Sequence, residues 1–204
     1  MFVILISSLF ATLSFVHKGN VTAGKASASI HQGDLILNGN NVTVIEGRFD
    51  INGSVIVEQN ATLVLKNAIV NFTQVSERQF NMTFRNPVNG NPHLQTCNST
   101  ITSRLDTLAY LEDNSTATIN NSTISWYLMA GDHSVLSISN NSYVRYQYGY
   151  DSSVINVNNS AIIEWHNYNY GGGGVQVQVY DSEINSLVLG PRSVDCTISK
   201  LGPG

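Results

Sequence analysis

Short apolar runs recur along this chain, and each is followed by an Asn-Ser step and another apolar residue. One such phrase, Asn-Ser-Thr-Ala-Thr-Ile-Asn-Asn-Ser-Thr-Ile, begins at Asn114. It returns as Ser-Val-Leu-Ser-Ile-Ser-Asn-Asn-Ser-Tyr-Val from Ser134, and as Ser-Val-Ile-Asn-Val-Asn-Asn-Ser-Ala-Ile from Ser153. A fixed period of about 20 residues predicts a solenoid, in which each unit buries its apolar side only against its neighbours.

Each unit is too short for a strand–helix–strand crossover, which needs about 30 residues. The unit is long enough for two or three short strands joined by tight turns. Stacked coils of this kind place equivalent residues about 4.8 Å apart, so the inward positions should form columns of Val, Ile and Leu. Asn121, Asn141 and Asn159 each precede a serine. Asn tolerates the left-handed backbone conformation of a bend, so these three residues should lie in adjacent layers.

The same pattern begins earlier in the chain. Leu35–Leu37 and Val42–Ile45 are apolar runs separated by the turn signal Asn38-Gly39-Asn40-Asn41. The run from Asn60 to Ile69 matches the later repeats. These runs predict strands before the clearest repeats begin.

With these runs the chain resembles the right-handed parallel β-helix proteins, the pectate-lyase-like architecture. The run Asn60–Ile69 is similar to those of secreted archaeal surface proteins of this class. The resemblance covers roughly Gly33 to Leu189 and implies an all-β, right-handed parallel β-helix solenoid. An antiparallel β-sandwich is the alternative; it fits the strand content but not the repeating Asn-Ser. Because the architecture hosts lyases, hydrolases, adhesins and structural proteins, it leaves the function open.

The solenoid is expected over residues 29–190, followed by a C-terminal tail over 191–204. Residues 74–107 interrupt the rhythm and contain Pro87 and Pro92. This segment predicts an irregular coil or a long loop leaving the solenoid, and loops on a rigid scaffold often carry function.

Residues 1–28 predict a secretory signal peptide, because an apolar stretch precedes the small-residue sequence Ala26-Ser27-Ala28. An apolar N-terminal segment that stays on the mature protein is the alternative. Sequons for N-glycosylation also indicate an extracellular protein or a cell-surface protein. An Asn- and Ser-rich repeat that makes sequons by chance is the competing explanation. The sequons begin at Asn20, Asn41, Asn52, Asn60, Asn71, Asn81, Asn98, Asn114, Asn120, Asn121, Asn140 and Asn158.

Charged residues make up 12% of the chain, and its net charge is −4. No basic stripe is present, so nucleic acid is not an expected partner. Cys97 and Cys196 are the only cysteines. They lack the spacing of a zinc site and are either a disulfide or two free thiols.

Asp113, Asp132 and Asp151 recur every 19 residues. Stacked carboxylates could bind Ca²⁺. The resemblance implies that a lyase of this architecture would combine such a cation with a basic residue. The basic residue nearest in sequence to these aspartates is Arg145. The favoured interpretation is that each Asp opens a turn, so no metal site is expected.

Glu164, His166 and His133 suggest acid–base chemistry, although they do not make a mechanism by themselves. Gly171–Gly174 lacks the strand and helix context of a nucleotide site. No cofactor is therefore expected.

Aromatic residues follow successive Asn-Ser pairs. Facing outward, they would form a ladder suited to sugar rings or a partner surface; facing inward, they would fill the core. The candidate face consists of Trp126, Tyr146, Trp165, Tyr148 and Tyr168.

These features favour a secreted, N-glycosylated structural protein of a cell surface or extracellular fibre. The tail ends in Gly-Pro-Gly without an obvious capping helix, so we expect head-to-tail self-association. A carbohydrate-binding or adhesive module is the alternative, and a polysaccharide lyase or hydrolase is the less favoured one.

Overall fold

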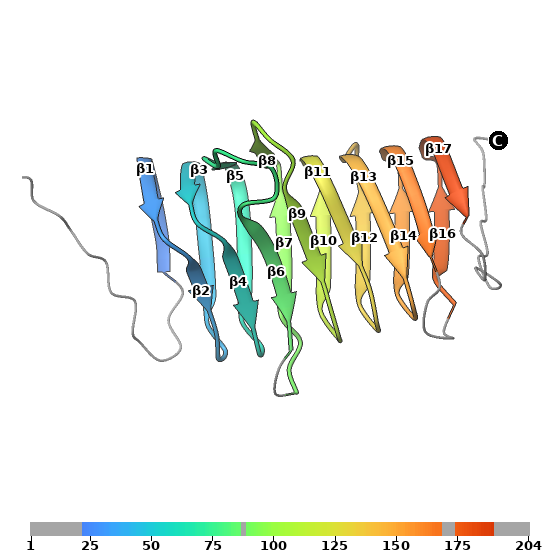
Figure 1. Cartoon of the computed structure of the whole chain (residues 1–204), viewed down its shortest axis with the longest axis horizontal. Coiled ribbons are helices and arrows are strands. Elements are labelled where there is room, and N and C mark those ends of the chain that lie inside the picture. Colours follow the sequence, from blue (N-terminus) through green and yellow to red (C-terminus); the bar gives the residue numbers. More distant parts are fainter. Residues whose placement is uncertain (1–21, 87–88, 169–173, 190–204) are drawn as a thin grey trace, which may run out of the picture.

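The structure, a computed structural model, describes residues 22–86, 89–168 and 174–189. These residues form strands and no helix, and the strands make one 17-stranded sheet. Every pairing in it is parallel, which confirms a parallel β-solenoid (Figure 1). The strands are β1 (Thr22–Gln32), β2 (Leu35–Leu37), β3 (Val42–Asn52), β4 (Val55–Glu58), β5 (Thr62–Phe72), β6 (Asn81–Arg85), β7 (His93–Cys97), β8 (Thr100–Ser103), β9 (Leu108–Leu111), β10 (Thr116–Asn120), β11 (Thr123–Ala130), β12 (Val135–Ser139), β13 (Tyr143–Tyr150), β14 (Val154–Asn158), β15 (Ala161–Tyr168), β16 (Gln176–Tyr180) and β17 (Glu183–Leu189).

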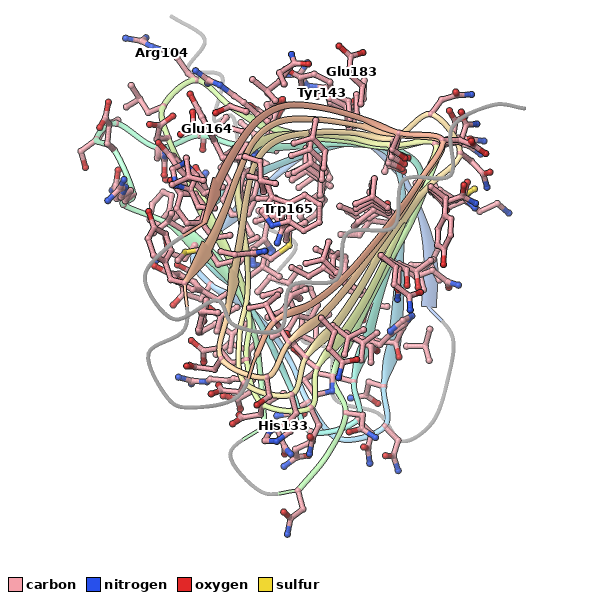
Figure 2. All side chains as sticks on the ribbon, turned by 90° about the vertical axis from the view of Figure 1, so that its right-hand side faces the viewer. Arg104, His133, Tyr143, Glu164, Trp165 and Glu183 are labelled. Atoms are coloured by element: carbon pink, nitrogen blue, oxygen red, sulfur yellow. The ribbon has the colours of Figure 1, made fainter. Side chains whose placement is uncertain are left out.

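About seven coils stack along the long axis, and successive coils lie about 21 residues apart. Seen along that axis, the solenoid has a roughly triangular cross-section (Figure 2). Face 1 contains β2, β4, β6, β9 and the second halves of β11, β13, β15 and β17. Face 2 contains the first halves of β1, β3 and β5, followed by β7, β10, β12, β14 and β16. Face 3 contains the second halves of β1, β3 and β5, followed by β8 and the first halves of β11, β13, β15 and β17.

The core is built from columns of aliphatic side chains, because strand alternation sends every second residue inward and the parallel register repeats it in each coil. Full burial of one such side chain contributes about 1.5–3 kcal/mol. One column on face 2 consists of Leu63, Leu94, Ala117, Leu136, Ile155 and Val177, all buried.

The corner between faces 2 and 3, here called the Asn–Ser corner, follows the predicted bend. Asn121, Asn141 and Asn159 have φ angles of 43°, 60° and 45°, so each occupies the left-handed region. The backbone N–H of Asn141 donates to the carbonyl of Asn159 at 2.6 Å, and the strands that follow are paired in register. The predicted stacking in adjacent layers is confirmed. Asn121 bonds Asn98 of the preceding coil through its side chain, with 2.7 Å between Nδ2 and Oδ1.

A column of buried serines lies beside these asparagines. The Oγ of Ser122 accepts the backbone N–H of Ser99 at 3.1 Å, and the Oγ of Ser142 accepts the N–H of Ser122 at 3.2 Å. Ser122 also donates its hydroxyl proton to the Asn120 carbonyl at 2.7 Å. The serine of each Asn-Ser pair is therefore a structural residue that connects one coil to the next.

The prediction of an irregular excursion over residues 74–107 is partly wrong. Three strands, β6, β7 and β8, keep this segment inside the solenoid, because the apolar side chains of Met82, Phe84 and Leu94 are buried in the core columns. The extra residues lie in loops between the strands, and two of these loops meet at the corner between faces 3 and 1. There the side chain of Gln74 donates to the carbonyls of Leu105 and Asp106.

At the N-terminus, the predicted cleavage sequence Ala26-Ser27-Ala28 lies within β1, which pairs with β3. Residues 1–21, the glycines 171–173 and the tail over 191–204 lie outside the described residues, so signal-peptide removal stays a prediction. Across the described ranges, none of the secondary structure is a helix that could span a membrane.

Candidate functional site

An aromatic cluster covers part of the outer surface of face 1. We define the aromatic stack as the rings of Tyr127, Tyr146, Tyr148, His166 and Tyr168, contributed by β11, β13 and β15. Tyr127 and Tyr146 are stacked with their ring centroids 4.5 Å apart, and Tyr148 and His166 are stacked at 4.7 Å. The parallel register explains this contact, because Tyr127 pairs with Tyr146, and Tyr148 with His166.

Trp126 and Trp165 do not belong to this surface, so their assignment to an exposed face is corrected. Both are buried, with 1% and 0% of their surface exposed, and Figure 2 shows Trp165 inside the triangle. Trp126 packs edge-on against Phe72 with 5.2 Å between the ring centroids, and Trp165 Nε1 donates to Asn167 Oδ1 at 2.8 Å. The tryptophans fill the core where the chain passes from face 3 to face 1.

The candidate face did not include Tyr127 or Arg78. The alternation of the strand contains the signal for Tyr127: Leu128 and Ala130 point inward, so Trp126 must also point inward and Tyr127 outward. Nothing in the sequence indicates Arg78, which reaches the stack from the loop before β6.

Two guanidinium groups cover faces of the stacked pair. Arg78 lies over the Tyr127 ring at 5.5 Å, and Arg145 lies over the Tyr146 ring at 4.8 Å, both measured from Cζ to the ring centroid. Each of these two rings therefore contacts one guanidinium and one neighbouring tyrosine ring. Sugar binding on aromatic residues needs an open ring face, so this pair presents edges and hydroxyls instead.

Both arginines contact Asp106. The backbone N–H of Arg78 donates to the backbone carbonyl of Asp106 at 2.7 Å, and the Arg145 guanidinium lies 4.0 Å from the Asp106 carboxylate. Asp106 therefore holds the loop at this corner against the stack.

The acid–base candidates are arranged in a chain of contacts on β15. Glu164 Oε1 bonds His166 Nε2, and His166 Nδ1 lies 3.0 Å from the Tyr168 hydroxyl. Nearby, burial raises the pKa of Tyr148, and the surrounding tyrosines and Glu164 raise it further. His133 is exposed at another corner, away from Glu164 (Figure 2), so the structure does not bring the three candidates together.

The aspartates form a column at the corner between faces 1 and 2, here called the Asp corner. Asp113, Asp132 and Asp151 have φ angles of 56°, 52° and 54°, which confirms that each residue opens a turn. The Oδ2 of Asp132 accepts the backbone N–H of Asp113 at 3.3 Å, so the carboxylate connects adjacent coils. In the part of the chain that the structure describes, no group of three or more His, Cys, Asp or Glu residues is placed to hold a metal ion.

The predicted sequons differ in accessibility. Asn41, Asn71, Asn81 and Asn120 are partly buried, and Asn20 lies outside the described residues. For the sequons at Asn120, Asn140 and Asn158, the third residue is a serine of the buried column, which accounts for these Asn-X-Ser sequences structurally. The exposed acceptors are Asn52, Asn60, Asn98, Asn114, Asn121, Asn140 and Asn158.

Cys97 is exposed at the end of β7 and forms no disulfide with any residue that the structure describes. Cys196 lies outside the described residues, so the suggested disulfide stays a prediction.

Comparisons with models of known protein families, with curated protein sequences and with solved structures give no match to this chain. The fold therefore defines the class: the chain is a parallel β-solenoid, a class that contains both enzymes and structural proteins.

Proposed function

We propose that the chain is a structural protein of a cell surface or extracellular fibre, secreted and N-glycosylated, whose solenoids associate end to end. One observation carries this proposal: parallel strand pairing continues along the described solenoid to its last two strands. Within residues 22–86, 89–168 and 174–189, β16 pairs only with β14, and β17 only with β15. An unpaired strand edge is a template for another chain.

The last described coil also exposes apolar surface. Leu187 continues the inward column that contains Trp165, yet 39% of its surface is exposed, whereas Trp165 is fully buried. A further coil placed on β17 would bury Leu187 in the way that β17 buries Trp165. This apolar end supports association along the solenoid axis.

Exposed sequons support glycosylation in a geometry that permits this association. Asn60 and Asn114 lie at the Asp corner, and Asn98, Asn121 and Asn140 lie at the Asn–Ser corner. Corners point away from the axis, so glycans attached there would project sideways and leave the ends of the rod accessible.

The alternative functions have less support from the geometry. Glu164 and His166 bond to each other, and the Arg145 guanidinium lies over the Tyr146 ring. The acidic and basic groups expected of a polysaccharide lyase or hydrolase are therefore engaged with neighbouring side chains. The covered faces of Tyr127 and Tyr146 also argue against stacking of neutral sugars. We therefore assign the aromatic stack a structural role in the rod.

The proposal is tested by the substitution Leu187→Lys, with Val188→Lys as a matched control. Both residues lie on β17 with 39% of their surface exposed, but Val188 points outward in the column of His166. An inward-pointing charge blocks strand pairing at an edge. We expect light scattering and electron microscopy to show end-to-end assemblies for the wild type and for Val188→Lys, and monomers for Leu187→Lys. Monomeric wild-type protein at high concentration would overturn end-to-end association.

Intact-mass measurement of native material, before and after enzymatic removal of N-glycans, tests the other half of the proposal. A secreted glycoprotein should lack its N-terminal segment and lose mass on deglycosylation. Full-length mass without glycans would contradict both secretion and glycosylation.

A further inference from the structure

Two tyrosines of the aromatic stack are held in a geometry that suits covalent coupling. Tyr127 and Tyr146 have ring planes only 14° from parallel, with their centroids 4.5 Å apart. Ring carbons of one phenol therefore lie over ring carbons of the other. Both residues are partly exposed, so a diffusible oxidant can reach them.

Three features hold this pair in place. The parallel register of β11 and β13 pairs the backbones of the two residues. Arg78 and Arg145 each contact one ring through its face, and a cation over an aromatic ring is attracted to it electrostatically. The Asp106 contacts to Arg78 and Arg145 then fasten the adjoining loop. The two rings have little freedom to separate.

The other aromatic contacts on face 1 are less suited to coupling. Tyr148 lies 5.7 Å from Tyr127 with planes tilted by 43°, and 6.4 Å from Tyr168. The closest neighbour of Tyr148 is the imidazole of His166. Among the tyrosine ring contacts of the described residues, Tyr127 and Tyr146 have the rings that lie closest together.

We propose that Tyr127 and Tyr146 are a site of oxidative modification, at which a dityrosine bond joins adjacent coils of the same chain. Each phenol gives one electron to the oxidant and one proton to solvent, leaving two phenoxyl radicals. A carbon–carbon bond forms between ortho carbons of the two rings, and the hydrogens on those carbons move to the oxygens, which restores two phenols.

The oxidant is hydrogen peroxide acting through a haem peroxidase. One peroxide accepts the two electrons and two protons and becomes two waters, so the chain loses two hydrogens in total. Holding two reactants side by side raises their effective concentration to about 10⁵ M or more. Coupling within the pair should therefore exceed coupling between molecules in dilute solution.

The bond would staple two coils that are otherwise connected at this face by ladder hydrogen bonds and ring stacking. For a structural rod this staple would slow local opening of face 1. The modification does not depend on end-to-end association, so it can be tested in the monomeric Leu187→Lys variant, where its failure is separate from failure of the proposed function.

The experiment treats folded Leu187→Lys protein with peroxidase and hydrogen peroxide, followed by measurement of dityrosine fluorescence and peptide mapping by mass spectrometry. We expect a cross-linked peptide joining Tyr127 to Tyr146, a loss of two hydrogens in intact mass and monomeric migration on a denaturing gel. Tyr127→Phe and Tyr146→Phe should each abolish this peptide and its fluorescence.

Tyr148→Phe is the matched control, because it removes a phenol of the same stack and leaves the proposed pair intact. It should retain the cross-link at the wild-type level. Circular dichroism of each variant before oxidation verifies that the solenoid is folded. A cross-link that joins other tyrosines, or that survives in Tyr127→Phe, would overturn the proposal, as would treatment of folded protein that yields no dityrosine.

Discussion

The Asn–Ser corner and the Asp corner both stack a buried serine in every regular coil, yet they use its hydroxyl differently. At the Asn–Ser corner, Ser122 Oγ accepts the N–H of Ser99 in the preceding coil. At the Asp corner, the hydroxyls of Ser115, Ser134 and Ser153 are buried without a hydrogen-bond partner. The same residue type therefore stabilises one corner and leaves a polar group unsatisfied at the other.

The turn geometry explains the difference. At the Asp corner, the N–H groups of Ser115 and Ser134 bond carbonyls of their own turns, those of Glu112 and Gly131. No serine N–H then remains to reach the hydroxyl in the next coil. At the Asn–Ser corner the turn between strands is shorter and contains the left-handed Asn121, Asn159 or the pair Asn140 and Asn141. The serine N–H there bonds the hydroxyl of the next coil. A column of buried serines therefore stabilises the solenoid only where the turn leaves a backbone N–H free to bond the serine hydroxyl of the next coil.

The largest expected difference in the free energy of unfolding is between serine variants at the two corners. Ser122→Ala should destabilise the solenoid, because the buried N–H of Ser99 loses its acceptor, which costs about 1–3 kcal/mol. Ser134→Ala should leave stability unchanged or raise it, because it removes an unpaired buried hydroxyl. Urea unfolding followed by circular dichroism measures both. Equal losses in the two variants would contradict the comparison.

A smaller effect is expected from the left-handed backbone that the two corners share. Asn121→Ala and Asn121→Gly both remove the side-chain bond to Asn98, but only glycine accepts a φ of 43° without strain. The glycine variant should be the more stable of the two by about 1 kcal/mol. The pair Asp132→Ala and Asp132→Gly should show the same order, since φ there is 52°. If alanine proves as stable as glycine in thermal unfolding, backbone strain does not govern these turns.

The smallest effect concerns charge at the Asp corner, where Glu112 lies beside the carboxylates of Asp113 and Asp132. Burial raises the pKa of Glu112, and the carboxylates of Asp113 and Asp132 raise it further, while Arg85 lowers it. Because the folded-state pKa exceeds the unfolded one, stability falls as pH rises from the unfolded pKa through the folded value. Glu112→Gln should therefore raise the melting temperature slightly at neutral pH and not in acid, below the unfolded pKa. A gain that is the same at every pH would show that charge is not its cause.

Local chemistry made much of the fold predictable. The recurring β-branched runs favour a β-solenoid when the repeat is too short for a helix, and Asn before Ser indicates a left-handed bend at Asn121, Asn141 and Asn159. Residues 74–107 were harder to predict, because prolines and arginines between the strands obscured Met82 and Phe84. Their apolar alternation places them in the core. That they occupy a core column becomes visible only when the neighbouring coils are in place.

The candidate site could be predicted only in part. Aromatic residues at the period of the repeat indicated a ladder, and Tyr146, Tyr148 and Tyr168 lie in one. The alternation of β11 is unbroken and places Trp126 inward, so the sequence contained the signal for that ring. In β15 the alternation breaks before Trp165, because Ile163 and Glu164 are both only partly buried. A local pattern does not locate such a break, so the side on which Trp165 lies was left open.

The sequence by itself determined that this chain winds into stacked β-coils, because the period, the β-branched residues and the turn residues all act within one coil or between adjacent coils. The tertiary structure alone decided which hydroxyls are satisfied, which aromatic rings form the core, and which loop residue, Arg78, reaches Tyr127. Those outcomes depend on the relative rotation and register of coils, which are set by the sum of contacts along the solenoid rather than by any single repeat.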